Sequence, residues 1–142
     1  MAIRRLVSAV VLILVLLSIA GCAGNPSEVT ADLGQGVSLS LGQSVVIPSE
    51  KLQIKFSEVI NDSRCPNGVI CIWAGEVSCL VEITHAEAVY PVVLTQPGLT
   101  GDPAQKTFQE YQLTFRVEPY PESGGPIPPE NYRLRLTVSQ LP

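Results

Sequence analysis

Three cysteines and the only histidine of the chain have the side-chain types that could perform metal or covalent chemistry. Cys65, Cys71, Cys79 and His85 have the right number and types of ligand for one zinc ion. Their spacings match no common zinc finger, and oxidation of the thiols competes with metal binding. We therefore expect no metal site here.

Catalytic patterns are sparse in this sequence. His85 has Glu82 and Glu87 nearby, but the chain contains no GxSxG, HExxH, GxGxxG or phosphate-binding glycine loop. The carboxylates of Glu58, Asp62 and Glu76 could ligate calcium, but they lie in no DxDxDG loop. We expect a protein that is not an enzyme and carries no cofactor.

The cysteines after residue 22 allow one disulfide in three ways: Cys65–Cys71, Cys65–Cys79 or Cys71–Cys79. The first closes a short loop through Pro66, Asn67 and Gly68, which favour a turn that can bring the two ends within bonding distance. Cys79 instead falls in phase with an apolar alternation, which is typical of a buried side chain. We expect a Cys65–Cys71 disulfide and a buried Cys79 thiol.

The first 22 residues have the organisation of an export signal. Arg4 and Arg5 precede an apolar run from Leu6 to Ala20, which is short for a membrane span. The run ends in Ile19-Ala20-Gly21-Cys22, which resembles the bacterial lipobox and implies cleavage before a lipidated Cys22. We expect a signal peptide over residues 1–21 and a lipid-modified Cys22 that holds the protein at the membrane.

This interpretation predicts an extracytoplasmic protein, anchored in the outer membrane if the host is Gram-negative. Loss of residues 1–21 leaves 7 Lys and Arg side chains against 13 Asp and Glu, a formal charge of −6. An acidic chain without a basic stripe in its sequence argues against nucleic acid as a partner. Gly24, Pro26, Gly34 and Gly36 predict a flexible tether over residues 22–36.

From residue 37 onward the apolar residues alternate with polar ones, as expected of strands with one buried face. Six or seven strands are expected and no helix. The expected strands contain Val45 and Ile47; Leu52 to Phe56; Val77 to Ile83; Tyr90 to Leu94; Tyr111 to Val117; and Tyr132 to Val138. Glycine- and proline-rich connections separate them, so we predict one all-β domain over residues 37–142, an antiparallel sandwich or a partly open barrel.

The segment Asp62-Ser63-Arg64-Cys65-Pro66, four further residues and then Cys71-Ile72-Trp73-Ala74-Gly75 resembles a pattern of small exported bacterial lipoproteins. Glu118-Pro119-Tyr120-Pro121 and Pro128-Pro129-Glu130-Asn131-Tyr132 are also similar to that group, which ends in a proline-rich loop and a final strand. The resemblance implies fold and export but supplies no activity. Cys79 is an addition to the group's two motif cysteines.

The motif also has a direct physical interpretation. Asp62 can accept backbone N–H groups at the turn or pair with Arg64, and Gly75 allows a positive φ before the next strand. Trp73 lies two residues after Cys71, so in extended backbone it would face the same side and cover the disulfide as part of the core. The alternative is a recognition surface formed by Asp62, Arg64, Trp73 and Glu76.

Two function classes remain. The first is a membrane-anchored, non-catalytic β module that binds a protein or glycan of the cell envelope or serves there as an accessory subunit. The second is an inhibitor of an extracytoplasmic protease or hydrolase that acts through the disulfide-closed loop 65–71, which is preorganised for binding. The loop from Pro121 to Pro129 could present a polyproline segment to a partner, although a stiff connection is the simpler interpretation.

Overall fold

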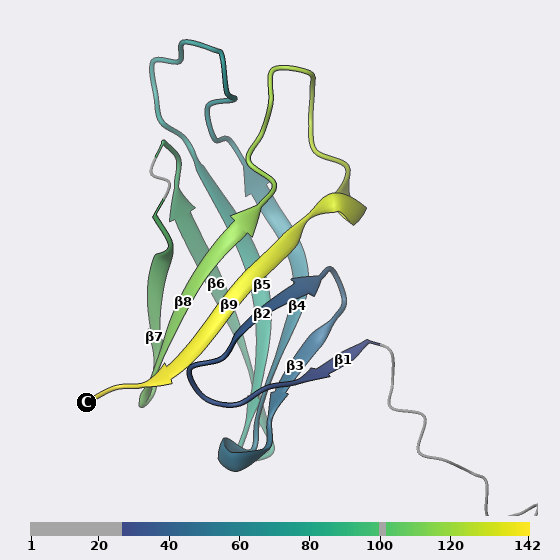
Figure 1. The fold of residues 1–142 in the computed structure, drawn as a ribbon, viewed down its shortest axis with the longest axis vertical. Helices are drawn as coiled ribbons and strands as arrows, with labels where there is room; N and C mark the ends of the chain where they lie inside the picture. The colour runs from purple at the N-terminus through teal and green to yellow at the C-terminus, as the bar shows by residue number, and fades with distance from the viewer. Residues whose placement is uncertain (1–26, 100–101) are drawn as a thin grey trace, which may run out of the picture.

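The computed structural model describes residues 27–99 and 102–142, so the expected signal peptide and Cys22 lie outside the described residues. The described chain folds as two β-sheets packed face to face (Figure 1). The all-β prediction is confirmed, and the two sheets form a sandwich rather than a closed barrel.

The first sheet has five strands in the order β1-β3-β4-β5-β6. Its strands are β1 (Glu28–Thr30), β3 (Ser44–Ile47), β4 (Leu52–Asp62), β5 (Glu76–His85) and β6 (Ala88–Pro97). All neighbours in this sheet are antiparallel except β1 and β3, which pair in parallel.

The second sheet has four strands in the order β2-β9-β8-β7, all antiparallel. Its strands are β2 (Gly36–Ser40), β7 (Ala104–Phe108), β8 (Tyr111–Glu118) and β9 (Arg133–Gln140). Two short 3-10 turns, η1 (Pro48–Glu50) and η2 (Pro129–Asn131), complete the described elements. None of the helical segments in this part of the chain is long and apolar enough to cross a membrane.

The core lies between the sheets and is made from the alternating residues that the sequence indicated. Phe56, Ile83, Leu113, Phe115 and Leu136 are at most 1% exposed. Burial of each such side chain contributes about 1.5–3 kcal/mol to the free energy of folding. The alternating pattern therefore determines which face of each strand turns inward, because a shift of one residue would expose every apolar side chain of the strand.

The predicted tether is too long at its C-terminal end. Residues 28–30 form β1, and Ala31 is buried in the core. The N–H of Ser44 donates to the carbonyl oxygen of Ser27 (2.8 Å), and that of Ala31 donates to Val46 (2.9 Å). The folded domain therefore includes residues 28–36, because backbone pairing with β3 orders a segment whose own sequence has no periodicity.

Candidate functional site

Two long connections meet at one end of the sandwich. We call residues 63–75, between β4 and β5, the disulfide loop, and residues 119–128, between β8 and η2, the proline loop. Figure 1 shows both rising side by side from the same end of the molecule. The three motif segments noted in the sequence, which are far apart along the chain, contribute to this end.

A buried ion pair supports the disulfide loop. Arg64 Nη2 lies 2.6 Å from Asp62 Oδ2, and the two side chains are only 2% and 10% exposed. Arg64 also donates to the carbonyl oxygens of Val117 (2.9 Å) and Pro119 (3.0 Å). The guanidinium thus joins the end of β4 to the end of β8. Its positive charge is paired with the Asp62 carboxylate inside the protein.

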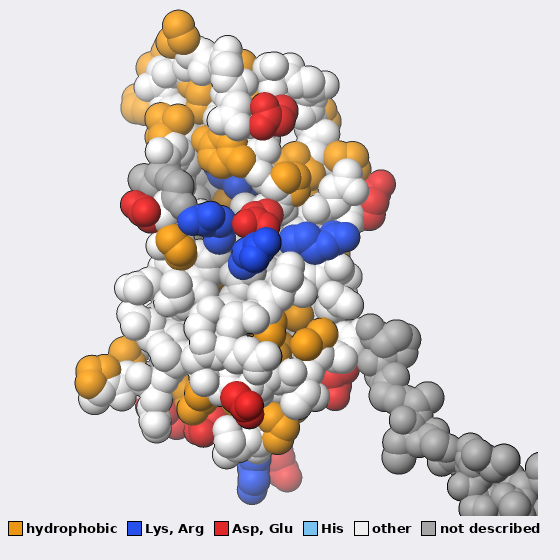
Figure 2. Space-filling model, in the orientation of Figure 1, with side chains coloured by type: hydrophobic (Ala, Val, Ile, Leu, Met, Phe, Trp, Pro, Cys, Tyr) orange, Lys and Arg blue, Asp and Glu red, His pale blue; other side chains and the backbone are white. Residues whose placement is uncertain are grey.

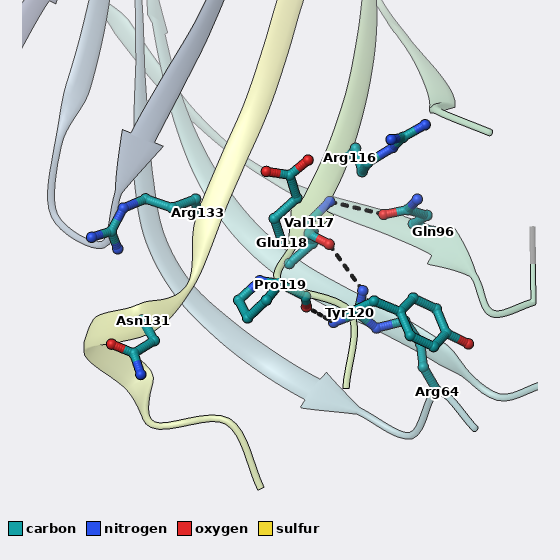
Figure 3. Close-up of a pocket in the computed structure, with 9 residues that line it drawn as sticks. All are labelled: Arg64, Gln96, Arg116, Val117, Glu118, Pro119, Tyr120, Asn131 and Arg133. Carbon is teal, nitrogen blue, oxygen red and sulfur yellow. Dashed lines mark hydrogen bonds between the residues drawn. The ribbon is translucent and has the colours of Figure 1, made fainter. Parts of the chain in front are cut away.

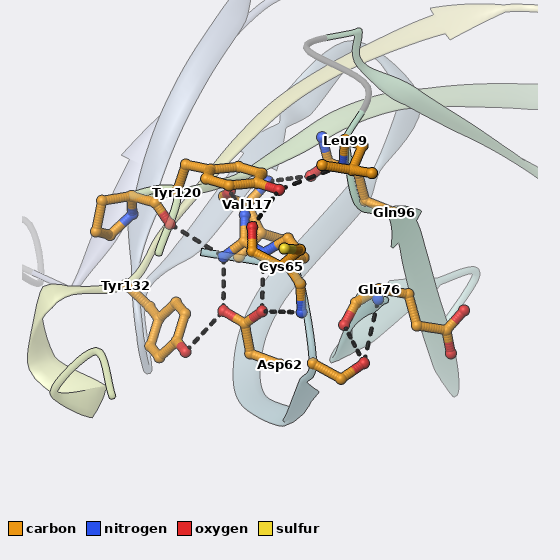
Figure 4. A network of polar contacts seen from close by, with 11 residues as sticks. Asp62, Cys65, Glu76, Gln96, Leu99, Val117, Tyr120 and Tyr132 are labelled. Carbon is orange, nitrogen blue, oxygen red and sulfur yellow. Dashed lines mark hydrogen bonds and ion pairs between the residues drawn. The ribbon is translucent and has the colours of Figure 1, made fainter. Parts of the chain in front are cut away.

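Tyrosines complete this network (Figure 4). The hydroxyl of Tyr132 donates to Asp62 Oδ2 (3.0 Å), and the ring of Tyr120 lies over the Arg64 guanidinium, 5.1 Å from its central carbon. Burial opposes ionisation of Asp62, but the bonds and charge of Arg64 and the bond from Tyr132 outweigh it and lower the pKa of the carboxyl group. Burial, and the bond to Asp62, raise the pKa of Tyr132 to about 12.

The disulfide loop is fixed to the proline loop by direct hydrogen bonds. Tyr120 donates its hydroxyl proton to the carbonyl oxygen of Cys65 (2.9 Å). The backbone N–H of Asn67 donates to Pro121 (3.0 Å), and its side-chain amide donates to Glu122 (2.8 Å). The proline loop therefore acts as a brace for the disulfide loop, and it does not project as an isolated polyproline segment.

The predicted disulfide between Cys65 and Cys71 is confirmed, with 5.9 Å between the two Cα atoms. Cys79 is a buried free thiol, and burial raises its pKa to about 12. Because two of the four candidate ligands are joined as a disulfide, the alternative zinc site does not exist in this structure. Across residues 27–99 and 102–142, no group of three His, Cys, Asp or Glu side chains is arranged to hold a metal ion.

The interpretation of Trp73 as a core residue over the disulfide is wrong. Its side chain is 80% exposed, beside Ile72 at 92% and Ile70 at 102%. Residues 70–74 lie in no β-strand, so the expected strand geometry that would turn Trp73 toward the bridge is absent. We call Val69, Ile70, Ile72 and Trp73 the apolar tip.

The other alternative, a single recognition surface of four residues, is also not formed. Asp62 and Arg64 point into the interior, whereas Trp73 and Glu76 are exposed. Glu76 uses its backbone rather than its carboxylate: its carbonyl oxygen accepts from the N–H of Ser63 (2.8 Å). Only Trp73 of the predicted set is available to a partner through an exposed apolar side chain.

His85 lies at the end of β5 opposite to the disulfide loop. Its Nδ1 is 2.9 Å from Gln109 Oε1, and its ring meets Tyr111 edge to face with 5.8 Å between centroids. Glu82, on the same strand, is 3.7 Å from Lys55. The contacts with Gln109 and Tyr111 hold the His85 ring in place. Neither of these two neighbours is the serine or carboxylate that a catalytic triad needs.

A cleft lies near the same end of the molecule, beside the start of the proline loop. It has a volume of about 820 Å³ and is lined by residues of β8, β9 and the start of the proline loop (Figure 3). Its lining includes three arginines, Arg64, Arg116 and Arg133.

Comparisons of this chain with protein family models, curated proteins and solved structures find no match.

Proposed function

We propose that the chain is a membrane-anchored bacterial lipoprotein whose β domain is a non-catalytic binding module for a protein of the cell envelope. The observation that supports this proposal is the apolar tip. Soluble proteins seldom expose a contiguous group of large apolar side chains, and where they do, the group commonly marks an interaction site. Tryptophan is enriched among the residues that contribute most to the binding energy of protein interfaces.

The contacts that hold the disulfide loop in place favour binding by the apolar tip. The disulfide, the Tyr120 bond to Cys65 and the two bonds of Asn67 hold the loop before a partner arrives. A loop that is already ordered loses little conformational entropy on binding, so more of the contact energy contributes to affinity. The buried Asp62–Arg64 pair provides a rigid base for this arrangement.

The chemistry of the tip favours a protein over a glycan. Ile70 and Ile72 offer aliphatic surface that carries no hydrogen-bonding group, which suits apolar side chains better than sugar hydroxyls. A hollow of about 530 Å³, lined partly by Cys71, Ile72 and Trp73, adjoins the tip. This hollow can receive an apolar side chain of the partner beside the indole ring.

The place of β1 is compatible with an anchor at Cys22. Glu28 pairs with Ser44, which in turn pairs with Lys55 of β4, seven residues before the loop end of that strand. The chain thus enters the domain partway along the sandwich and away from the apolar tip (Figure 1). Six residues from Cys22 to Glu28 span at most about 20 Å, so a lipid on Cys22 would hold the domain near the bilayer and leave the tip accessible.

The same loop supports a second candidate function, inhibition of an extracytoplasmic protease or hydrolase. The specific observation is Ile70, which is fully exposed one residue before the bridged Cys71. A rigid loop with one outward aliphatic side chain can enter the specificity pocket of an enzyme and block it. This candidate differs from the first in the partner, and the experiment below separates the two.

The test is photocrosslinking in the intact bacterium that produces the protein. Benzoylphenylalanine replaces Ile70, with replacement of Val93 on the outer face of β6 as the matched control, and the crosslinked protein is identified and purified. We expect one partner captured from Ile70 and not from Val93, and an affinity at least tenfold lower for Trp73→Ala than for Val93→Ala.

Either of two results contradicts the proposal: equal capture from Ile70 and Val93, or an unchanged affinity of Trp73→Ala for the purified partner. If the partner is a protease or hydrolase, its activity is measured with and without the protein. Inhibition that disappears when the Cys65–Cys71 disulfide is reduced would favour the inhibitor.

A further inference from the structure

An asparagine followed by a glycine occupies an exposed turn of the disulfide loop. Of the four asparagines in the chain, Asn67 alone precedes a glycine, Gly68, and both residues are exposed. An asparagine side chain can react with the backbone nitrogen of the next residue, and that nitrogen is most accessible when the next residue has no side chain. Asparagine is accordingly among the chemically labile residues of proteins. This pair is therefore a candidate modification site.

The geometry of the turn requires a glycine at position 68. The N–H of Val69 donates to the carbonyl oxygen of Pro66 (3.2 Å), which closes a four-residue turn. Gly68 has a φ of 77°, the left-handed value that the third residue of a type II turn adopts. The residue that allows the turn to form is thus the residue that leaves Asn67 open to attack.

The nitrogen of Gly68 is available for this reaction. Its N–H has no hydrogen-bond acceptor in the part of the chain that the structure describes. A Cβ on Gly68 would meet no atom within 4 Å, so open space surrounds the residue. Neither a hydrogen bond nor close packing restrains this nitrogen.

Asn67 holds the disulfide loop against the proline loop with two hydrogen bonds. Its backbone N–H donates to Pro121 (3.0 Å), and its Nδ2 donates to Glu122 Oε1 (2.8 Å). Tyr120 holds the loop separately, at the buried Cys65. The bond to Glu122 also restrains the side-chain amide, which must leave the carboxylate before it can react with the Gly68 nitrogen.

We propose that Asn67 is a site of spontaneous deamidation, and that the modification releases this turn of the disulfide loop from the proline loop. The Gly68 nitrogen attacks Asn67 Cγ and forms a C–N bond, the Cγ–Nδ2 bond breaks, and Nδ2 leaves as ammonia with the proton of the Gly68 nitrogen. Water then opens the cyclic imide at either carbonyl group, which yields aspartate or isoaspartate. The modification needs no partner protein and is independent of the binding function proposed above.

The product cannot keep the contact with Glu122. An aspartate carboxylate has no N–H to donate, and it would face a second carboxylate where the amide now lies. Glu122 is the only acidic residue of the two loops, and Arg64, their only basic residue, is paired with Asp62. Figure 2 shows one acidic side chain among hydrophobic and uncharged ones at the loop end. Neither loop has a second cation to offset the added charge, so the two carboxylates repel each other.

Isoaspartate changes the backbone as well. It routes the chain through the former side-chain carbonyl and adds one methylene group to the main chain before Gly68. The bond from Val69 to Pro66 and the bond from residue 67 to Pro121 then lose their alignment. Both products therefore weaken the contacts that hold the turn beside the apolar tip.

The first test follows the reaction in the purified protein during incubation at neutral pH. Peptide mapping by mass spectrometry measures the gain of one mass unit at each asparagine. We expect Asn67 to be converted first, while Asn61 and Asn131, which precede larger residues, serve as internal controls and stay intact. Gly68→Ala should slow the conversion several-fold, because a methyl group hinders the approach of the nitrogen.

Glu122→Ala tests the restraint on the side-chain amide. It removes the acceptor of Nδ2, and we expect Asn67 to be converted about threefold faster or more than in wild type. Glu130→Ala is the matched control, because it also removes one acidic side chain but takes no hydrogen-bond acceptor from Asn67. It should leave the rate of conversion unchanged. Urea titration verifies that each variant folds.

Substitutions at both positions test the structural consequence. Asn67→Asp imitates the product and should speed hydrogen exchange at the backbone N–H of residue 67 several-fold. Asn67→Asp combined with Glu122→Gln should restore most of the protection, since the glutamine amide can donate to the new carboxylate.

Three outcomes overturn the proposal: Asn67 is converted no faster than Asn61 and Asn131, Glu122→Ala and Glu130→Ala have the same rate of conversion, or Asn67→Asp exchanges as slowly as wild type. None of these measurements uses a binding partner. The proposal therefore stands or fails separately from the one for the apolar tip.

Discussion

The hydroxyl of Tyr132 donates a hydrogen bond to the Asp62 carboxylate across 70 residues of sequence, with 3.0 Å between the two oxygens. Asp62 ends β4 in one sheet, and Tyr132 immediately precedes β9 in the other. The bond therefore joins the two sheets at the end from which the loops emerge. Together with the contacts of Arg64, this bond holds the ends of β4 and β8 and the start of β9 in place beneath the disulfide loop and the proline loop.

Replacement of Asp62 by alanine is expected to lower the free energy of unfolding at pH 7 by about 3–5 kcal/mol. The change leaves the Arg64 guanidinium buried without its counter-ion, which is the costly way to break a buried ion pair. Urea titration measures the change. Glu82→Ala is the control, because it breaks the half-exposed pair with Lys55 and should cost at most about 1 kcal/mol.

The same carboxyl group predicts the response to acid. Its pKa is lower in the folded protein than its ordinary value of 3.8, so its contribution to stability is present above that value. The contribution is lost as the pH falls through the lower folded value. Asp62→Asn should flatten this loss in urea titrations below about pH 4; a wild-type acid profile identical to that of the variant would contradict the role assigned to Asp62.

Tyr132→Phe is expected to weaken the response to alkali. The pKa of Tyr132 is raised to about 12 from an ordinary value of 10, so the unfolded chain ionises first. The stabilising contribution is therefore complete below pH 10 and is lost as the pH rises from 10 toward 12. Thermal unfolding across this range should show a smaller decline for Tyr132→Phe than for wild type, and an equal decline in the two proteins would contradict the role assigned to Tyr132.

Gly75→Ala should prevent folding or cost more than about 3 kcal/mol. Gly75 has φ near 68°, and a Cβ at this position would collide with the backbone carbonyl of Ser63. Gly124→Ala is the matched control, since its Cβ would meet no atom within 4 Å. The urea concentrations at the unfolding midpoints measure both changes. A stable Gly75→Ala protein would contradict the close approach of Gly75 to the backbone of Ser63.

Loss of the disulfide is expected to reduce stability by about 2–2.5 kcal/mol, the chain-entropy estimate for a loop of this length. Because Cys71 is exposed and Cys65 is buried, Cys71→Ser is the milder substitution. The double variant Cys65→Ala, Cys71→Ser should bind the tip's partner more weakly than its change in stability alone explains. Equal binding by the double variant and wild type would show that preorganisation of the loop contributes nothing to affinity.

A mature chain that begins at a lipidated Cys22 is the expected product of processing. Intact-mass measurement of protein extracted from the membrane should show loss of residues 1–21 and added acyl groups. Cys22→Ser should leave uncleaved precursor or release the domain from the membrane. Recovery of wild-type protein with residues 1–21 attached and an unmodified Cys22 would contradict the anchor.

The sequence was most informative where a strand has one buried face. The alternations from Leu52 to Phe56 and from Tyr111 to Val117 predict their strands and their inward residues, because burial follows a period of two. β1, β2 and β7 were not predicted. β1 is only three residues long and is ordered by pairing with β3, a contact that no local pattern encodes.

The candidate site was less accessible to prediction for a related reason. Cys65–Cys71 follows from loop geometry, which is local, and it was predicted. The exposure of Trp73 depends on the path of the loop, and the clustering of Arg116 with Arg135 depends on strand register. Each of these is set by residues far along the chain, so composition and spacing did not indicate the exposure of Trp73 or the position of Arg116 opposite Arg135.

The strand order leaves the ten-residue β6 as an outer strand of its sheet, with Val89, Tyr90 and Val93 exposed on it. A long apolar strand in this position is a template for uncontrolled pairing with other chains. Pro91 lies near its middle and Pro97 at its end, and neither has an N–H to donate. Two prolines thus protect the molecule against edge-to-edge aggregation, a protection of particular value to proteins held at high local concentration on a surface.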